Sequence, residues 1–296
     1  MEERNYQRRG YLKESFRLFH LRDIGVEEME YHYHEFHKAV FFLAGSAGYL
    51  IEGRSYFLQP GDVLLVGRHL IHKPVIDPTQ PYERVILYLD PDLLDGALPG
   101  EESLAQCFRL ARERRFALIR PVGEDRQVLA ELLGRLEQTL KEPEEFGGEL
   151  LARSCLFQLL IRLNRMALRD TTSQREGVSR FDPKIAQILD YINGSLAADL
   201  SVDALAARCY TSKFHFMRRF RALTGYSVHQ YVSEKRLLAA AELLRQGVSA
   251  QEAGLRCGFQ DYSAFQRAFK RQFGLTPRQL RNGERLGSWG TERPTE

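Results

Sequence analysis

Residues 258–281 read GFQDYSAFQRAFKRQFGLTPRQLR, and an earlier stretch of the chain repeats their pattern. Residues 212–227 (SKFHFMRRFRALTGYS) align with residues 261–276 (DYSAFQRAFKRQFGLT). Phe216 then pairs with Phe265 at a spacing of 49 residues, and the other pairs of the segment have the same spacing. Upstream the repeat continues at a spacing of 48, which pairs Cys209 with Cys257. A repeat of this length indicates a supersecondary unit that is used twice.

Each copy is predicted to form two short helices joined by a tight turn. In the first copy Ser201 begins one helix and Ser212 the next, and in the second copy Asp261 takes the place of Ser212. These side chains accept hydrogen bonds from the backbone N–H groups at a helix start. Aromatic and aliphatic residues then recur at helical spacing as a buried stripe: Phe216, Phe220 and Leu223 in one copy, and Phe265, Phe269 and Phe273 in the other.

The opposite face of each second helix carries polar and basic side chains, as in a helix-turn-helix that reads DNA. We expect base contacts mainly from Arg218 and Arg267, because an arginine fork matches the O6 and N7 atoms of guanine. Arg221 and Lys270, one turn later, suit phosphate contacts instead. The predicted DNA-contacting set is Phe214, Met217, Arg218, Arg221, Ser263, Gln266, Arg267 and Lys270.

This part of the chain, residues 200–281, resembles the AraC family of bacterial transcription regulators. The residues that carry the resemblance are Gly258-Phe259, Phe265, Arg267, Phe269, Lys270, Gly274, Thr276-Pro277 and Arg281, with Tyr231, Arg236 and Leu243-Leu244 in the helix between the repeats. The resemblance implies a homodimer that binds two successive major grooves of double-stranded DNA per chain, and contacts RNA polymerase if it is an activator, the role that we favour. Ala250, Ala253 and Gly254 depart from the family pattern, which predicts a softer second repeat and a dominant role for Arg218.

Length and charge agree with a two-domain DNA-binding protein. The chain has 296 residues, of which 44% are hydrophobic and 27% charged, so two packed domains are expected. From Phe181 onward there are 17 Lys and Arg against 11 Asp and Glu, a net charge of +6 on the repeat half. The start lacks a signal peptide and there is no membrane span, which predicts a cytoplasmic protein. The four scattered cysteines suit buried thiols.

Residues 15–90 carry the signals of short strands separated by turns, which indicates a barrel or sandwich. The order of His32 and His34, Gly45, Gly48, Pro60-Gly61-Asp62 and His72 resembles a cupin domain, and this resemblance implies a sensor barrel. A small effector, either a sugar or an organic anion, would then bind inside it. The candidate ligand-binding residues are His32, His34, Lys38, Tyr49, His72, Arg84 and Tyr88, with Tyr56 as a further candidate.

The histidines also suggest a metal, with His32, His34 and His72 as candidate ligands. Lys38 stands where the resemblance to metal-binding cupins implies a carboxylate, and an ammonium group repels a cation. We therefore expect no metal, no other cofactor and no catalytic residue, and the chain is not predicted to be an enzyme. The alternative is a metal-dependent cupin enzyme fused to a DNA-binding domain. A ligand-independent architectural binder is disfavoured, because it would not need the barrel.

The predicted fold class is α+β with two domains, a cupin-like barrel with a helical dimerisation segment and an all-α tandem helix-turn-helix. Residues 126–140 place Val128, Leu129, Leu132, Leu133, Leu136 and Leu140 on one helix face, and residues 149–168 do the same with Leu151, Cys155, Leu159, Leu163 and Met166. We expect the second of these helices to pair in the dimer. The predicted boundaries are a sensor domain at residues 1–169, a linker at 170–180, the DNA-binding domain at 181–283 and a disordered tail at 284–296.

Overall fold

The computed structural model describes residues 7–8, 12, 14–25, 29–96, 103–114, 116–169 and 182–283. These residues form two compact units, of which the first holds almost all of the described residues up to 169 and the second holds residues 182–283. The predicted linker at 170–180 and the predicted tail at 284–296 lie outside the described residues, as does most of the N-terminal arm. In the described chain, no helix is long and apolar enough to span a membrane.

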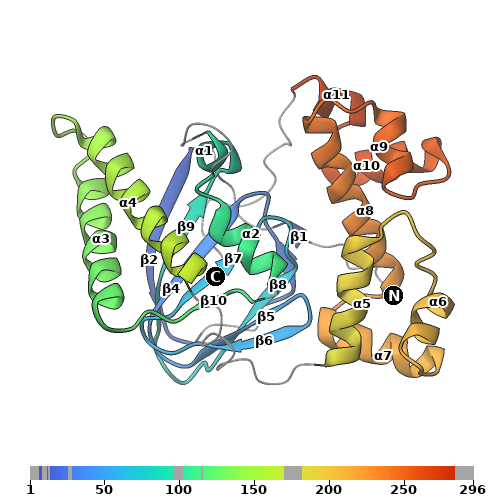
Figure 1. Ribbon diagram of the computed structural model, residues 1–296, viewed down its shortest axis with the longest axis horizontal. Coiled ribbons are helices and arrows are strands. Elements are labelled where there is room, and N and C mark those ends of the chain that lie inside the picture. Colours follow the sequence, from blue (N-terminus) through green and yellow to red (C-terminus); the bar gives the residue numbers. More distant parts are fainter. Residues whose placement is uncertain are drawn as a thin grey trace. The chain divides into compact units, whose positions relative to one another are not determined.

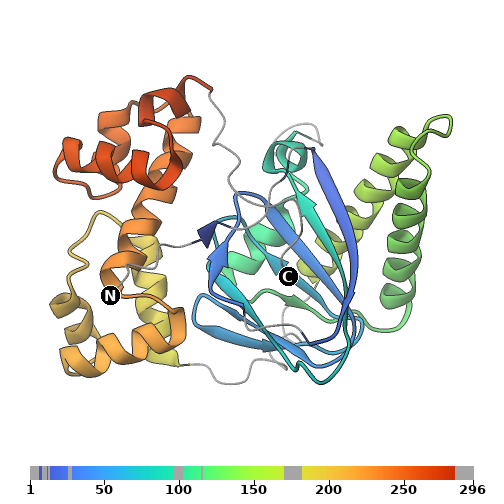
Figure 2. The ribbon, with the colours of Figure 1, turned by 180° about the vertical axis from the view of Figure 1, so that it is seen from behind.

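Two five-stranded sheets form the first unit (Figures 1 and 2). One sheet has the order β1-β3-β8-β5-β6 and the other the order β10-β7-β4-β9-β2. The strands are β1 (Gln7–Arg8), β2 (Phe16–Asp23), β3 (His32–Tyr33), β4 (His37–Ala44), β5 (Ala47–Ile51), β6 (Arg54–Phe57), β7 (Val63–Val66), β8 (His72–Ile76), β9 (Tyr82–Leu89) and β10 (Leu118–Ile119). The predicted β-rich domain is therefore confirmed.

The middle strands of the second sheet, β7, β4 and β9, are almost entirely buried. Successive side chains of a strand point to opposite sides, so both faces of these strands are covered. Along β4, Val40 and Phe42 pack in a core that also contains side chains of β5 and β6, the strands of the other sheet. Ala39 and Phe41 pack in a separate core formed with the helices. This is why β4 reads as an almost unbroken run of buried residues.

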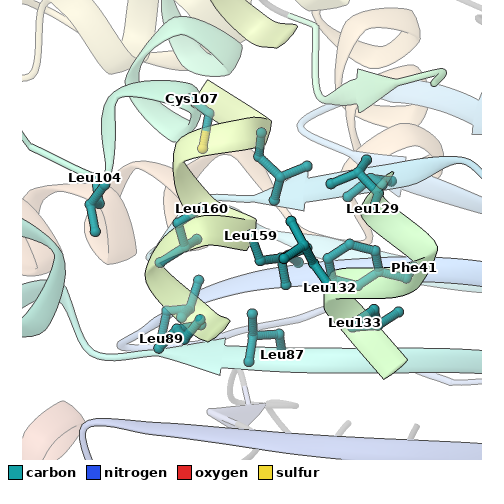
Figure 3. Packing of buried hydrophobic residues seen from close by; sticks show 14 of the residues in the cluster. Phe41, Leu87, Leu89, Leu104, Cys107, Leu129, Leu132, Leu133, Leu159 and Leu160 are labelled. Atoms are coloured by element: carbon teal, nitrogen blue, oxygen red, sulfur yellow. The ribbon is translucent and has the colours of Figure 1, made fainter. Parts of the chain in front are cut away.

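The described residues after β9 form the helices α1 (Pro91–Asp95), α2 (Gln106–Glu113), α3 (Gly123–Lys141) and α4 (Gly148–Arg169), with β10 between α2 and α3. Figure 3 shows leucines of α3 and α4, including Leu132 and Leu159, meeting Phe41 and Leu87 of the sheet. In this helical layer Asn164 accepts a hydrogen bond from the Cys107 backbone N–H at 2.6 Å. Its side-chain amide also donates to the Leu104 carbonyl at 2.8 Å, so α4 is tied to the start of α2.

Two leucines on the predicted helix faces were expected to be buried, and this expectation was wrong. Leu151 is 55% exposed and Leu140 is 36% exposed, although both were predicted to pack with the core leucines. Both lie beside the α3–α4 turn, where residues 141–147 are all exposed and the hairpin points away from the sheet (Figure 1). Helical spacing predicted the direction of these side chains, but the sheet does not extend far enough to cover them.

Strand β8 contains a proline, which weakens the sequence signal for a strand. Proline has no backbone N–H and is normally confined to sheet edges. Here β8 lies inside its sheet, with Pro74 opposite Tyr49 of β5. On its other side β8 pairs with β3 only at His32 and His72, so Pro74 lies beyond that short paired segment.

The second unit is all-helical, as predicted. Its helices are α5 (Pro183–Gly194), α6 (Val202–Arg208), α7 (Lys213–Thr224), α8 (Val228–Arg245), α9 (Ala250–Arg256), α10 (Tyr262–Phe273) and α11 (Pro277–Arg281). Side-chain caps at Ser201, Ser212 and Asp261 begin three of them at the predicted positions, and Asp182 caps α5 in the same way. Cys209 and Cys257 are buried free thiols, like Cys107 and Cys155 in the first unit.

Arg236 of α8 and Gly258 together hold the loop that precedes α6. The guanidinium of Arg236 donates to the carbonyls of Leu196 at 2.9 Å and Ala198 at 3.1 Å. Gly258 adopts φ +84° and approaches this loop so closely that an added Cβ would lie 2.5 Å from the Leu196 carbonyl oxygen. A glycine is therefore required here by both backbone conformation and space.

We expect Gly258→Ala to destabilise the second unit more than Gly247→Ala, by at least ~1 kcal/mol. Both glycines have positive φ, but nothing lies within 4 Å of a Cβ added at Gly247. The pair of variants therefore separates the backbone strain from the clash with the Leu196 carbonyl. Urea unfolding of the full chain, followed by far-UV circular dichroism, measures both losses, and equal losses would contradict this explanation of Gly258.

A second prediction concerns His20 on β2, which bonds to Glu137 of α3 at 2.9 Å and to Glu83 of β9 at 3.1 Å. The hydrogen bond to Glu137, followed by the weaker one to Glu83, raises the pKa of His20 above its usual value despite partial desolvation. A raised pKa gives stability that is complete below about pH 6.5 and is lost as pH rises through the folded-state pKa. His20→Gln should therefore lower unfolding stability by ~0.5–1 kcal/mol near pH 5.5 and less near pH 8.5.

The control for this prediction is Glu137→Gln, which removes the main partner and leaves the histidine in place. It should reduce stability in the same pH direction as His20→Gln but by a smaller amount, because it breaks the charge-assisted hydrogen bond to Glu137 and leaves the one to Glu83. Thermal unfolding of the full chain at the two pH values is the measurement. A loss in His20→Gln that does not depend on pH would show that the ring acts only through packing.

Candidate functional site

The two predicted reading helices, α7 and α10, are built alike. Each has 12 residues and begins at a side-chain cap, Ser212 in α7 and Asp261 in α10. Each ends at a glycine in the left-handed conformation, Gly225 with φ 78° and Gly274 with φ 72°. Matching caps and C-terminal glycines give the two helices the same length and the same start.

Burial of the aromatic stripe determines which side chains of each helix face outward. Phe216, Phe220, Phe265 and Phe269 are completely buried, and Phe273 is nearly so. All eight predicted DNA-contacting residues are exposed: Phe214, Met217, Arg218, Arg221, Ser263, Gln266, Arg267 and Lys270. The structure therefore places each predicted set along one outer face, and their contact with DNA stays a prediction.

Arg219 of α7 contacts an acidic side chain at the start of another helix. It forms an ion pair with Asp182, the cap of α5, and so ties α7 to that helix. The equivalent position in α10 is Ala268, which carries no charge. The neighbouring Arg218 and Arg267 keep the same residue type in both copies. This contrast supports a structural role for Arg219 and a shared role for the other two.

Two exposed tyrosines beside the reading helices were not among the predicted contacts. Tyr210 is 93% exposed and takes a positive φ of 50° in the turn before α7. The repeat spacing pairs it with Gly258, which was a signal that this backbone position is left-handed. Tyr262, at the first position of α10, accepts a hydrogen bond from the Gln266 amide at 3.1 Å, which orients that predicted base-contacting side chain.

Helix packing explains why residue 254 is a glycine, which the sequence alone did not show. It is buried in α9, and a Cβ added there would lie 3.0 Å from the Phe265 ring. The small residues of α9, which were expected to soften the second repeat, therefore let α9 and α10 approach closely. Close approach offsets part of the low helix propensity of glycine.

In the first unit, the predicted ligand-binding side chains gather in the barrel interior. His32, His34, Lys38, Tyr49, His72, Arg84 and Tyr88 are all at most 2% exposed. They form a chain of close neighbours: the ring centroids of His34 and Tyr88 are 5.7 Å apart, and those of Tyr49 and His72 are 6.4 Å apart. The further candidate Tyr56 is buried in the same core cluster as Tyr49, and its ring is 5.9 Å from the Phe116 ring.

Three histidines form the centre of this cluster. The His32 and His72 rings are 4.4 Å apart, and the His34 ring is 5.1 Å from His32 and 5.0 Å from His72. Their ligand nitrogens all lie within 4.8 Å of one another. Burial, followed by the charges of His32 and Lys38, holds the pKa of His72 well below its usual value, so this imidazole is neutral at physiological pH.

The two buried basic side chains of the cluster differ in their surroundings. Arg84 forms an ion pair with Asp23, donates to the Tyr82 carbonyl at 3.0 Å and lies 4.1 Å from the Tyr82 ring centroid. The Lys38 amine lies 5.6 Å from the Tyr49 ring centroid, and burial lowers the pKa of Lys38 well below its usual value. The charge of Arg84 is therefore already compensated by a carboxylate.

Sequence reasoning missed Tyr82 and Phe36 as members of this cluster. The Tyr82 hydroxyl is 3.0 Å from the Tyr49 hydroxyl, and the Phe36 ring stacks on His34 at 4.7 Å. Tyr82 begins β9 two residues before Arg84, so strand alternation could have identified it. Phe36 lies in a bend between β3 and β4, where no period predicts the side-chain direction.

Comparison with known families matches both units. A family of AraC-like ligand binding domains matches residues 21–160, and a helix-turn-helix domain family matches residues 205–283. The chain belongs to the AraC family of transcription regulators. It is a DNA-binding transcription regulator that carries a ligand-binding domain.

Similar proteins have regulatory names. The HTH-type transcriptional activator RhaS of Salmonella schwarzengrund and its namesake in Salmonella typhi are each 26% identical over 266 residues, which cover 85% of this chain and 87% of the relative. Because these relatives are transcription regulators, they are consistent with a chain that is not an enzyme.

Solved structures also align with the chain. The DNA-binding domain of AdpA in complex with a target DNA is 37% identical over 34% of this chain and 91% of its own, with a TM-score of 0.33. ToxT from Vibrio cholerae is 12% identical over 91% of this chain and 98% of its own, with a TM-score of 0.34. Since these TM-scores are low, family membership follows from the two domain families and the relatives.

Proposed function

We propose that this regulator is a homodimeric activator, that each chain binds two successive major grooves of DNA, and that a small effector in the barrel controls it. The observation that carries the DNA part is the pair of equal helices, α7 and α10, which expose the same positions outward. We propose domain limits at residues 1–169 and 181–283, with a linker at 170–180. The activator role is supported by relatives that are named transcriptional activators, and an activator must contact RNA polymerase.

The length of α8 supports the two-groove arrangement. This helix has 18 residues and connects the two helix-turn-helix units. At a rise of ~1.5 Å per residue it is ~27 Å long, close to the ~34 Å that separates successive major grooves on one face of DNA. Its start is fixed by a capping box between Ser227 and Gln230, and Gln272 of α10 donates to Glu234 of α8 at 2.7 Å. The spacer is therefore positioned as a rigid element.

We assign base reading to Arg218 and Arg267. In the first repeat two apolar side chains are proposed to contact bases as well. Phe214 is 72% exposed and Met217 is 39% exposed, although large apolar side chains are normally buried. Their exposure beside an arginine suits contact with thymine methyl groups next to a guanine. The second repeat offers Ser263 and Gln266 instead, so the two half-sites should differ in sequence.

The effector is proposed to bind among the polar side chains in the barrel interior. A buried lysine, three histidines and two tyrosines offer both hydrogen-bond donors and acceptors to a sugar or an organic anion. Because Asp23 already pairs with Arg84, an anionic effector would depend mainly on Lys38. These side chains are at most 2% exposed, so an effector reaches them only when parts of the domain move.

For DNA reading we predict that Arg218→Ala and Arg267→Ala each lose ~1–3 kcal/mol of binding free energy and relax the base preference at one position. Lys270→Ala should weaken all sites alike and reduce the salt slope by about one unit, as expected for a phosphate contact. Selection from a randomised DNA library by the full-length variants, at two salt concentrations, measures both effects. Arg218→Ala should be the more damaging arginine variant.

Arg219→Ala is the matched control, because Arg219 pairs with Asp182 and lies on the same helix as Arg218. It should lower stability without relaxing any base position. Uniform weakening by Arg218→Ala and Arg267→Ala, with every base preference kept, would refute their assignment as base readers and make them phosphate contacts.

Dimerisation is proposed to use the exposed apolar side chains at the α3–α4 turn. Phe146 and Leu150 are fully or largely exposed, at 107% and 75%, and Leu151 and Leu140 lie beside them. The leucines in the middle of α4, such as Leu159, are buried against the sheet, so they cannot also form a dimer interface. A self-complementary apolar patch under two-fold symmetry suits a second copy of the chain.

We expect the double change Leu150→Glu, Leu151→Glu to convert the full-length dimer into a monomer at tens of micromolar, because it introduces charge into the patch. Leu168→Glu is the control, since Leu168 is 54% exposed at the other end of α4. Analytical ultracentrifugation distinguishes the two states. If Leu168→Glu dissociates the dimer and the double variant does not, the interface lies at the C-terminal end of α4.

A further inference from the structure

We infer that the effector carries a single carboxylate group and that this group binds to the Nε and Nη2 nitrogens of Arg84 inside the barrel. The inference rests on the proposed effector site and narrows the chemical class of its ligand. Arg84 is on β9 and is completely buried. Its Nη1 group donates to the Asp23 carboxylate and to the Tyr82 carbonyl. In the part of the chain that the structure describes, its buried Nε and Nη2 groups have no hydrogen-bond partner.

The two nitrogens without a partner form one edge of the guanidinium group. Because this group is planar, the N–H of Nε and one N–H of Nη2 point in parallel, whereas Nη1 lies on the opposite side. The edge matches the two oxygens of a carboxylate, each of which accepts one hydrogen bond. Buried donors without an acceptor oppose folding. A carboxylate satisfies both nitrogens at once and adds the negative charge that a sugar hydroxyl lacks.

A second arginine of the same unit shows this edge already filled. Arg120 donates from Nε to one oxygen of Asp62 and from Nη2 to the other, both at 2.9 Å. Arg84 differs because the carboxylate of Asp23 lies on its Nη1 side and leaves the Nε–Nη2 edge open. Among the described residues, Arg84 therefore lacks the acceptor that Arg120 has at the same edge.

Two tyrosines lie between Arg84 and the buried amine of Lys38. The Arg84 guanidinium is 4.1 Å from the Tyr82 ring centroid, and the Lys38 amine is 5.6 Å from the Tyr49 ring centroid. The two tyrosine hydroxyls are 3.0 Å apart, so one of them donates to the other. The hydroxyl that accepts keeps its own hydrogen for a further acceptor. Arg84 and one tyrosine thus supply directed hydrogen bonds, and Lys38 supplies charge.

The balance of charge favours one carboxylate over a more highly charged anion. Arg84 and Lys38 are the basic side chains of the cluster, and the carboxylate of Asp23 compensates one of them. Burial and the charge of Arg84 lower the pKa of Lys38, and a negative charge nearby counters both effects. One carboxylate therefore completes the balance, whereas a phosphate dianion would exceed it beside Asp23.

The experiment uses acetate as the probe and the full-length protein. Thermal unfolding is followed in rising concentrations of sodium acetate, with sodium chloride at equal ionic strength as the reference, and the shift gives a dissociation constant. Acetate should raise the unfolding temperature, and acetamide, which has the same shape without the charge, should not. Arg84→Lys and Lys38→Met should each weaken acetate binding by ~10-fold or more, because each removes a charged partner. Lysine does not reproduce the arginine edge.

Arg120→Lys is the matched control, because its edge is occupied by Asp62. This variant should lower stability and keep the effect of acetate. Asp23→Asn gives a positive signal that does not depend on the loss of a buried group, since the Asp23 side chain is 44% exposed. Removing this negative charge should tighten acetate binding by ~10-fold.

Three results would overturn the inference: no effect of acetate on the wild type, an equal effect on Arg84→Lys, or no tighter binding by Asp23→Asn. D-glucose is tested in parallel as a neutral sugar. Stabilisation by D-glucose but not by acetate also overturns the carboxylate inference, yet it keeps the barrel as the effector site. Stabilisation by neither compound overturns the inference and leaves the proposed effector site without support.

Discussion

The reading surface depends on the burial of two aromatic stripes. A helix that packs one stripe of phenylalanines against its neighbours has only one face left for solvent. Phe216 and Phe220 in α7, and Phe265 and Phe269 in α10, are completely buried, so Arg218 and Arg267 must both face outward at the same turn of their helices. The core thus sets the direction of the side chains proposed to read bases, and the left-handed glycines after each helix set where that face ends.

The same alternation argument explains why a lysine is buried in the barrel. Lys38 is on β4 between residues whose directions are determined by packing, and it shares a face with Val40 and Phe42. A slip of one residue would exchange the two faces of β4 and bury Lys38 among the leucines of α3 and α4. The register that gives two apolar cores therefore also places a polar side chain in the interior.

The features predicted from sequence are those encoded within a few neighbouring residues. Helix caps such as Ser212 and Asp261, and stripes of phenylalanine, depend on spacing alone, and the structure confirms them. Contacts between distant strands are not encoded in this way. The sequence showed His32 and His72 as candidates, but their direct pairing depends on β8, a strand whose Pro74 argues against it. The expected burial of Leu151 was wrong for a different reason, because α4 extends beyond the sheet against which Leu151 was expected to pack.

The polar side chains buried in the barrel link ligand binding to the stability of the sensor domain. Burying an amine and three imidazoles opposes folding, since each loses contact with water. A molecule or ion that bonds to these groups only in the folded state stabilises it, by ~2.7 kcal/mol at a concentration 100 times its dissociation constant. Lys38 and His72 lie on β4 and β8, one in each sheet. A ligand that bonds to both would hold the two sheets together, and this gives the sensor domain a physical means of responding to its effector.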